Sequence, residues 1–240
     1  MSLTEAPAAP RLAAIVYDEE VAIDLLLHVF AQDLSARRVR VGGVLNELGP
    51  EPGCGPDQPL HLRDLRSGES IRLCHRLETD TGEARCRLEP RSLSLAGASI
   101  RSACERGAQV VFLPRFGKQE LQGSGFRDVF EQVGALSCAV LTAVPRLLVE
   151  PWRTFTRGAC TLLSPRLREL HAWWAATEPQ LQHTDAAWDV ENVRWNVQDQ
   201  TRPALRAPNF ARDTSKNGPG RDWYGACGAP ARQHDEPAIS

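Results

Sequence analysis

Runs rich in apolar residues alternate with amphipathic stretches over the first two thirds of the chain. The apolar runs suit strands buried on both faces of a sheet, and they cover residues 12–17, 39–45, 109–113 and 138–144. Apolar residues at helical spacing lie between or after these runs, in segments 18–34, 88–106, 125–133 and 151–157. This alternation predicts a three-layer α/β domain with a largely parallel sheet.

A β-hairpin is predicted between the second and third of these strands. Two alternating stretches, 60–65 and 70–77, flank the turn residues Arg66-Ser67-Gly68-Glu69. The helix expected after the hairpin, over 88–106, would turn an apolar stripe toward the core, made of Leu93, Leu95, Ile100 and Cys104.

The composition changes after Ser164, and five of the six tryptophans lie beyond it: Trp173, Trp174, Trp188, Trp195 and Trp223. We expect an α/β domain over 11–163, a Trp-rich helical extension over 164–199 with a helix at 185–197, and a mostly disordered tail over 200–240 that lacks periodicity. The tryptophans could dock a partner or fold back over the sheet as a cap.

Charge and cysteine usage narrow the class of protein. A net charge of −2 and a pI of about 6.3 give no general attraction to nucleic acid or to an anionic membrane. No apolar stretch approaches the roughly 18 residues that span a bilayer, and residues 1–10 lack the apolar core of a signal peptide. Seven cysteines without a close Cys-x-x-Cys pair suit reduced thiols. A cytoplasmic location is therefore expected.

Acidic residues follow the first strand, where a P-loop NTPase keeps its phosphate-binding loop. Such a loop reads Gly-x-x-x-x-Gly-Lys-Ser/Thr, because glycine amides and the lysine hold phosphate and the hydroxyl holds magnesium. This chain instead has Asp18, Glu19, Glu20 and Asp24. Like charges about 4 Å apart repel by on the order of 1 to 4 kcal/mol in a wet site, whereas a helix end stabilises an anion by only about 0.3 to 1 kcal/mol. We therefore expect a degenerate phosphate loop.

Two alternatives remain for these acids. They could simply cap and solvate the start of the helix, with Asp18 as the capping residue. They could also receive a cation or a basic segment of a partner.

A second group of candidate residues follows the strand at 109–113. An NTPase would place an acidic residue here for magnesium, but this chain has Pro114 and Arg115. Lys118, the only lysine in the first 215 residues, lies just beyond Arg115. Fork-shaped arginine donors and a lysine charge suit a phosphate-like or molybdate-like anion, which predicts an oxyanion pocket made of Arg115, Gly117, Lys118 and Arg127. Alternatively, Gly117 makes a turn, Lys118 pairs with Glu120 or a helix end, and the arginines lie in solvent.

Other chemistry has little support in the sequence. Cys74 and His75, with Cys54, Cys86 and His61, could supply zinc ligands, but their spacing is irregular. His28 lies on a leucine-rich helix and is better explained by packing than by catalysis. No familiar nucleophile or metalloprotease motif is present in the sequence.

Several phrases of the chain resemble a bacterial family, domain of unknown function 2478. They are Phe116-Gly117-Lys118-Gln119-Glu120 with Gly123, Gly125, Phe126 and Arg127, and the segments 64–68, 86–90, 140–145 and 152–155, within a resemblance that covers 12–158. The family is itself similar to small P-loop nucleoside triphosphatases, and its members are often encoded beside molybdate transport or molybdoenzyme genes. The chain departs from the family at Pro114 and Arg115, where Asn and Lys are usual, and at Cys54, where a Cys-x-Cys pair is common.

The resemblance implies a P-loop NTPase-like fold with the hairpin as an insertion, and molybdate or another small oxyanion as a ligand. With the acidic loop, it predicts a non-hydrolytic accessory or binding protein in oxyanion handling. One alternative is a nucleotide-binding NTPase with Lys118 on phosphate and Asp18 or Glu120 on magnesium. Another is an interaction module that recruits a protein through 164–240. The sequence identifies no cofactor and no catalytic residue.

Overall fold

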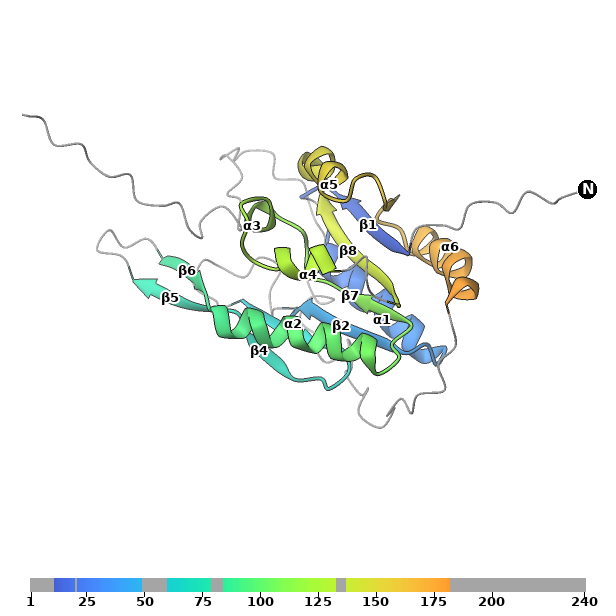
Figure 1. The fold of residues 1–240 in the computed structure, drawn as a ribbon, viewed down its shortest axis with the longest axis horizontal. Helices are drawn as coiled ribbons and strands as arrows, with labels where there is room; N and C mark the ends of the chain where they lie inside the picture. Colours follow the sequence, from blue (N-terminus) through green and yellow to red (C-terminus); the bar gives the residue numbers. More distant parts are fainter. Residues whose placement is uncertain (1–10, 20, 49–59, 79–83, 133–136, 182–240) are drawn as a thin grey trace, which may run out of the picture.

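One seven-stranded sheet organises the part of the chain that the structure describes. The computed structural model describes residues 11–19, 21–48, 60–78, 84–132 and 137–181. The sheet has the order β4-β3-β2-β7-β8-β1-β9 (Figure 1). Its strands are β1 (Leu12–Tyr17), β2 (Val41–Asn46), β3 (His61–Asp64), β4 (Ser70–Arg72), β7 (Val110–Phe112), β8 (Ala139–Pro145) and β9 (Thr161–Leu163). Strands β2, β7, β8, β1 and β9 run parallel to one another, and β3 and β4 form a hairpin whose strand β3 pairs antiparallel with β2. The predicted parallel sheet with a hairpin insertion is confirmed.

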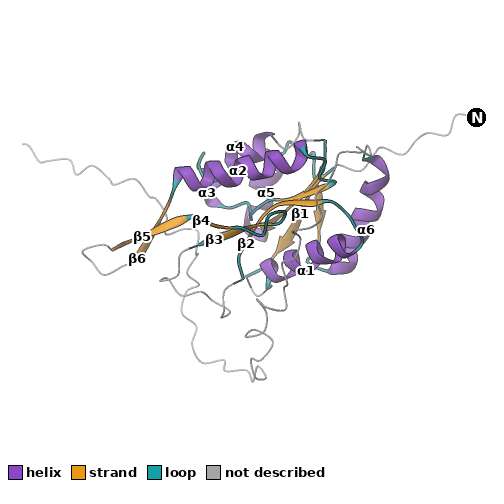
Figure 2. Cartoon of the chain, turned by 90° about the horizontal axis from the view of Figure 1, so that it is seen from below, coloured by secondary structure: helices purple, strands orange, loops and turns teal. Residues whose placement is uncertain are grey.

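Helices cover both faces of this sheet, which gives the expected three layers (Figure 2). Helices α1 (Ile23–Ala36) and α6 (Leu167–Thr177) lie on one face. The other face carries α2 (Pro90–Glu105), α3 (Lys118–Leu121), α4 (Arg127–Gln132) and α5 (Val149–Phe155). Short 3-10 turns, η2 (Arg146–Leu148) and η3 (Glu178–Gln180), precede α5 and follow α6.

A separate apolar core fills the space on each side of the sheet. Because side chains alternate along a strand, β7 contributes Phe112 to the core beneath α1 and Val111 to the core beneath α2. Phe30 of α1 packs on Phe112 with ring centroids 6.1 Å apart. On the other face, Phe116 and Trp152 have ring centroids 4.8 Å apart and are both fully buried.

Three strands and one side of a helix differ from the sequence prediction. Strands β5 (Cys74–Glu78) and β6 (Ala84–Leu88) form a second hairpin where one long strand and a helix start were expected. Strand β9 was not predicted, because three residues give too short a pattern. On α2, Ile100 and Cys104 are buried as expected, but Leu95 is 54% exposed. The small residues Ala96 and Gly97 are buried there instead, and Gly97 faces Val129 of α4.

Two of the cysteines expected to be reduced form a disulfide. Cys104, in the last turn of α2, is bonded to Cys138, just before β8, across 34 residues of sequence. Cys74 is also disulfide-bonded, whereas Cys160 is not. The prediction of reduced thiols was wrong for these residues, because sequence spacing does not show that the end of α2 and the start of β8 meet in space. Cys54 lies outside the described residues.

The first two tryptophans of the C-terminal part pack against the domain. Trp173 and Trp174 of α6 are 5% and 4% exposed and belong to the core beneath α1. Of the two alternatives for the tryptophans, the burial of this pair agrees with packing over the sheet. The remaining predictions for this part, a helix at 185–197 with Trp188 and Trp195, and a tail over 200–240 with Trp223, concern residues outside the described ranges. Within the described ranges, no helix combines the length and hydrophobicity needed to cross a bilayer.

Replacing Gly43 with Ala should destabilise the fold strongly. Gly43 pairs with Phe112 and has φ +94°, and a Cβ atom there would overlap the backbone of Phe112. Backbone strain and overpacking each cost about 1 to 3 kcal/mol, so we expect a loss of about 3 kcal/mol or more in the free energy of unfolding, measured by urea denaturation.

Gly68→Ala is the matched control for this substitution. Gly68 has φ +74°, but a Cβ atom added there would have no neighbouring atom within 4 Å, so only the backbone strain of about 1 to 2 kcal/mol applies. Equal losses for the two variants would contradict the close approach of β2 and β7 at Gly43.

Candidate functional site

Polar side chains collect at the carboxyl ends of four neighbouring parallel strands. Asp18 follows β1, Asn46 ends β2, Arg115 follows β7 and Arg146 follows β8. Ligands of α/β proteins bind at this edge of the sheet, because the loops that leave the strands meet there. This edge of the sheet is therefore the candidate functional site.

An ion pair joins the start of α1 to the end of β7. A guanidinium nitrogen of Arg115 lies 3.5 Å from Oδ2 of Asp24, and each side chain is about a quarter exposed. The side-chain amide of Asn46 donates to Oδ1 of the same carboxylate at 3.1 Å. Asp24 thus has a cationic partner and an amide donor from two adjacent strands.

A buried histidine holds the end of β2, which carries Asn46. His28, one turn further along α1, is fully buried and donates from Nε2 to the backbone oxygen of Asn46 at 2.7 Å. Burial lowers the pKa of His28 below its ordinary value, so the ring is neutral at pH 7. The predicted packing role of His28 agrees with its burial, and the hydrogen bond adds a role in holding the end of β2.

A second arginine neutralises the first acid of the loop after β1. Arg146 donates two hydrogen bonds to the carboxylate of Asp18, at 2.8 and 2.9 Å, and lowers the pKa of that carboxyl. The expectation that Asp18 caps the following helix was wrong, because α1 begins only at Ile23, after Ala22, with no side-chain cap. Glu19 is exposed, and Glu20 lies outside the described residues.

These two ion pairs lie at the carboxyl edge of the sheet. Asp24 lies in the first turn of α1 and Arg115 lies just after β7. The guanidinium of Arg115 therefore joins the start of α1 to the end of β7, at the edge where α/β proteins bind their ligands.

Glu120 closes the loop that follows β7. Its carboxylate accepts hydrogen bonds from the backbone amides of Gly117 and Phe126, at 2.8 and 3.0 Å, and the side chain is buried. Burial raises the pKa of Glu120 above its ordinary value, although the two amide bonds oppose this by favouring the charged form. Glu120 therefore fixes the shape of the loop from inside.

The four residues predicted for an oxyanion pocket have different surroundings. Arg115 is paired with Asp24, the Gly117 amide donates to Glu120, and Lys118 is exposed. Arg127 contacts Glu131 at 2.7 Å, donates to the backbone oxygen of Glu120 at 2.9 Å and lies over the ring of Phe155. Of the four, only Arg115 lines the recess between α2, α3 and the ends of β2 and β7, together with Asn46, Leu60, Leu73, Leu93, Gln119, Glu120 and Phe126.

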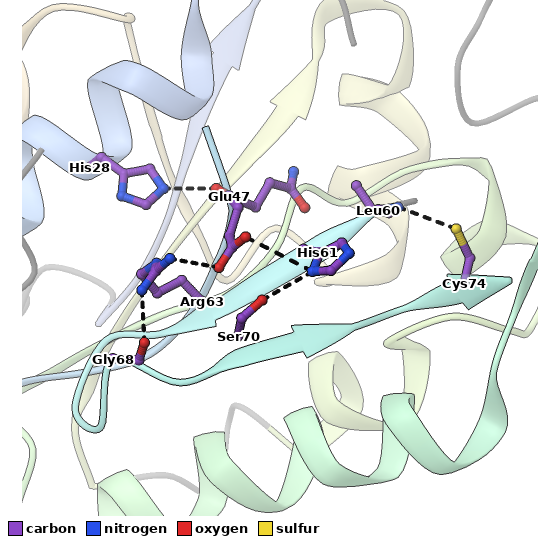
Figure 3. Close-up of polar contacts among 9 residues, drawn as sticks. His28, Glu47, Leu60, His61, Arg63, Gly68, Ser70 and Cys74 are labelled. Atoms are coloured by element: carbon purple, nitrogen blue, oxygen red, sulfur yellow. Dashed lines mark hydrogen bonds and ion pairs between the residues drawn. The ribbon is translucent and has the colours of Figure 1, made fainter. Parts of the chain in front are cut away.

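A further polar cluster, on the β3–β4 hairpin, did not emerge from the sequence. Glu47, directly after β2, lies 2.8 Å from a guanidinium nitrogen of Arg63 and 3.9 Å from Nδ1 of His61 (Figure 3). The same His61 nitrogen lies 3.0 Å from Oγ of Ser70. The signal was present in the alternation of 60–65, which places His61 and Arg63 on one face of the strand.

The zinc alternative loses one of its proposed ligands. Cys74 is in a disulfide, whereas zinc binds a cysteine thiolate. His61 contacts Ser70 and Glu47. Across the described part of the chain, no group of three His, Cys, Asp or Glu residues is placed to hold a metal ion.

The strand order and the helices on both faces (Figure 2) define an α/β protein of the P-loop NTPase-like kind. The chain belongs to the family DUF2478, described as protein of unknown function, which matches residues 12–173. The suspected family resemblance is thereby confirmed.

Two known proteins are similar to this chain. Over 171 residues it is 33% identical to a protein of Bradyrhizobium diazoefficiens named molybdenum import ATP-binding protein ModC 2, which covers 71% of this chain but about a fifth (19%) of that relative's length. The solution structure of a human cancer-related nucleoside triphosphatase aligns with a TM-score of 0.54 at 22% identity, covering 72% of this chain and 100% of the other. The second similarity concerns the fold alone.

Replacing Glu120 with Gln should change how stability depends on pH. The folded pKa of Glu120 is raised above its ordinary 4.5, so its contribution to stability is fully present below about pH 4.5 and is lost as the pH rises through the folded pKa. A glutamine does not titrate. The free energy of unfolding of the wild type, relative to Glu120→Gln, should therefore fall from pH 4.5 toward pH 7 in urea denaturation.

Glu131→Gln serves as the control, because the Glu131 side chain is 49% exposed. This variant should keep the wild-type pH slope. A constant difference between wild type and Glu120→Gln over the whole pH range would show that burial does not shift the pKa of Glu120.

Proposed function

We propose that this chain is a non-hydrolytic accessory protein, derived from a P-loop NTPase fold, that acts in the handling of molybdate or a related oxyanion. The observation that carries the proposal is the ion pair of Asp24 with Arg115. A P-loop NTPase holds magnesium with a Ser or Thr in the first turn after its loop and an acid at the end of a neighbouring strand. Here the first turn of α1 carries Asp24, and its carboxylate is already paired with Arg115. A magnesium ion would have to displace that guanidinium, and a triphosphate would have to displace the Asp18 carboxylate from Arg146.

The loop after β1 also lacks the groups that hold phosphate in an active NTPase. It has no glycine to bring backbone amides together and no lysine, and the first turn of α1 offers a carboxylate where a hydroxyl would bind magnesium. Loss of all three groups supports a binding or accessory role over catalysis.

The similarity to a molybdenum import ATP-binding protein supports a role for this chain in oxyanion handling. The matched segment leaves four fifths of that relative uncovered, so its ATP-binding activity need not reside in the matched part. We infer that this chain works beside a separate ATP-binding protein of oxyanion transport. A cytoplasmic location fits that role.

The oxyanion residues predicted from the sequence, Arg115, Gly117, Lys118 and Arg127, stay part of this proposal. Two of them have acidic partners in the structure, Asp24 for Arg115 and Glu131 for Arg127. An anion that bound there would have to compete with those carboxylates. Lys118 is the exposed cation of the set.

Calorimetric titration with ATP or GTP in the presence of magnesium should give no binding heat, and no triphosphate hydrolysis should be measured. Asp18→Ala and Asp24→Ala are the controls, because hydrolysis that survives both substitutions belongs to a contaminant. Nucleotide binding that either substitution abolishes would contradict the proposal and favour an NTPase with an altered site.

Molybdate or tungstate should raise the melting temperature of the protein. At ten times the dissociation constant, ligand linkage adds about 1.4 kcal/mol, or about 3 to 6 °C for a domain of this size. The measurement is a thermal melt against sodium chloride of equal ionic strength. No shift with any tetrahedral oxyanion would remove the oxyanion part of the proposal.

A further inference from the structure

Four hydrogen-bond donors share one face of the β3–β4 hairpin. The strand register pairs His61 with Arg72 and Arg63 with Ser70. Residues directly opposite each other on antiparallel strands point to the same face, with Cβ atoms roughly 4.5 to 5.5 Å apart. Leu62, which alternates with them, is fully buried in the core beneath α2. We call these four residues, His61, Arg63, Ser70 and Arg72, the hairpin donor face.

The donor face is both ordered and accessible. Arg63 donates to the backbone oxygen of Gly68 at 2.7 Å, and His61 lies 3.0 Å from the hydroxyl of Ser70. Ser70 and Arg72 are exposed, and the side chains of His61 and Arg63 are 29% and 23% exposed. The donor face is therefore open to solvent at Ser70 and Arg72 and partly open at His61 and Arg63.

The carboxylate of Glu47 lies beside two residues of the donor face. Glu47 reaches from the end of β2 and places one oxygen 2.8 Å from Arg63 and the other 3.9 Å from His61 (Figure 3). Arginine forks bind carboxylates and tetrahedral oxyanions with the same geometry. Glu47 therefore shows that an anionic oxygen can lie beside Arg63 and within reach of His61.

The cluster is not a catalytic triad, although it contains Ser, His and an acid. Ser70 and Glu47 both approach Nδ1 of His61. A triad needs the serine on one ring nitrogen and the acid on the other, so that the histidine can relay a proton. The arrangement is suited to binding.

The balance of charge distinguishes this face from the other arginine sites. Arg115 is matched by Asp24 and Arg127 by Glu131, one acid to each arginine. On the hairpin, Arg63 and Arg72 accompany the carboxylate of Glu47. The donor face therefore brings two guanidinium groups to the same face as Glu47, in a chain whose net charge is −2.

We propose that the hairpin donor face binds a tetrahedral oxyanion dianion, which displaces Glu47 from Arg63 and accepts hydrogen bonds from Ser70, His61 and Arg72. The inference rests on the proposed role in oxyanion handling and assigns the anion to a place that the sequence did not indicate. Glu47 acts as an internal competitor, so weak anions are excluded and a dianion is favoured.

Isothermal calorimetry of the full-length chain with molybdate, phosphate and sulfate tests the assignment. Charge-assisted hydrogen bonds contribute enough for Arg63→Gln and Arg72→Gln each to weaken binding by roughly tenfold or more. Glu47→Gln removes the competitor and should strengthen binding by roughly tenfold. Arg72 is exposed and Arg72→Gln should leave the fold intact, which circular dichroism melts verify.

Arg168→Gln is the matched control, because the Arg168 side chain on α6 is 73% exposed and lies in a different element. It should leave binding unchanged. Affinity that is unaffected by Arg63→Gln and Arg72→Gln but lost in Arg115→Gln with Lys118→Ala would overturn the inference while keeping the oxyanion role. Absence of binding in both wild type and Glu47→Gln would also overturn it, and the nucleotide titration judges the non-hydrolytic role separately.

Discussion

The ion pair between Asp24 and Arg115 constrains the whole carboxyl edge of the sheet. It ties the first turn of α1 to the end of β7, and Asn46 joins the same carboxylate from β2. Since both charged groups are only partly exposed, removing either one would leave the other poorly solvated. The charged groups at this edge of the sheet are therefore paired with side chains of the same chain. The neighbouring pair of Asp18 with Arg146 follows the same principle at the next loop.

The β-strands of the parallel sheet were predictable because each is an apolar run that the sheet buries. β1 was expected at 12–17 and spans Leu12–Tyr17, and β8 was expected at 138–144 and spans Ala139–Pro145. The short strands β6 and β9 were missed, because three to five residues with charged or half-exposed positions carry no clear period. On α2, the small residues Ala96 and Gly97 are buried, so the prediction that Leu95 faces the core was wrong.

The candidate site was predictable only in part. The carboxyl ends of β1 and β7 drew attention to Asp18, Asp24 and Arg115, but the sequence did not indicate that Asp24 and Arg115 pair. Ending the second strand at Leu45 left Asn46 and Glu47 out of consideration, although both lie at the same edge. Pairing of side chains from distant segments depends on strand order. The hydrophobic pattern of the sequence predicts each strand but not the order of the strands in the sheet.

The disulfide between Cys104 and Cys138 encloses β7, the Glu120 loop, α3 and α4 in one covalent ring. A ring of this length restricts the unfolded chain and contributes about 3 to 4 kcal/mol in the chain-entropy description. Arg115 lies inside this ring, so the disulfide restrains the unfolded chain on both sides of one partner of the Asp24 ion pair. A covalent bond thus ties the end of α2 to the start of β8, two segments that the sequence separates by the whole Glu120 loop.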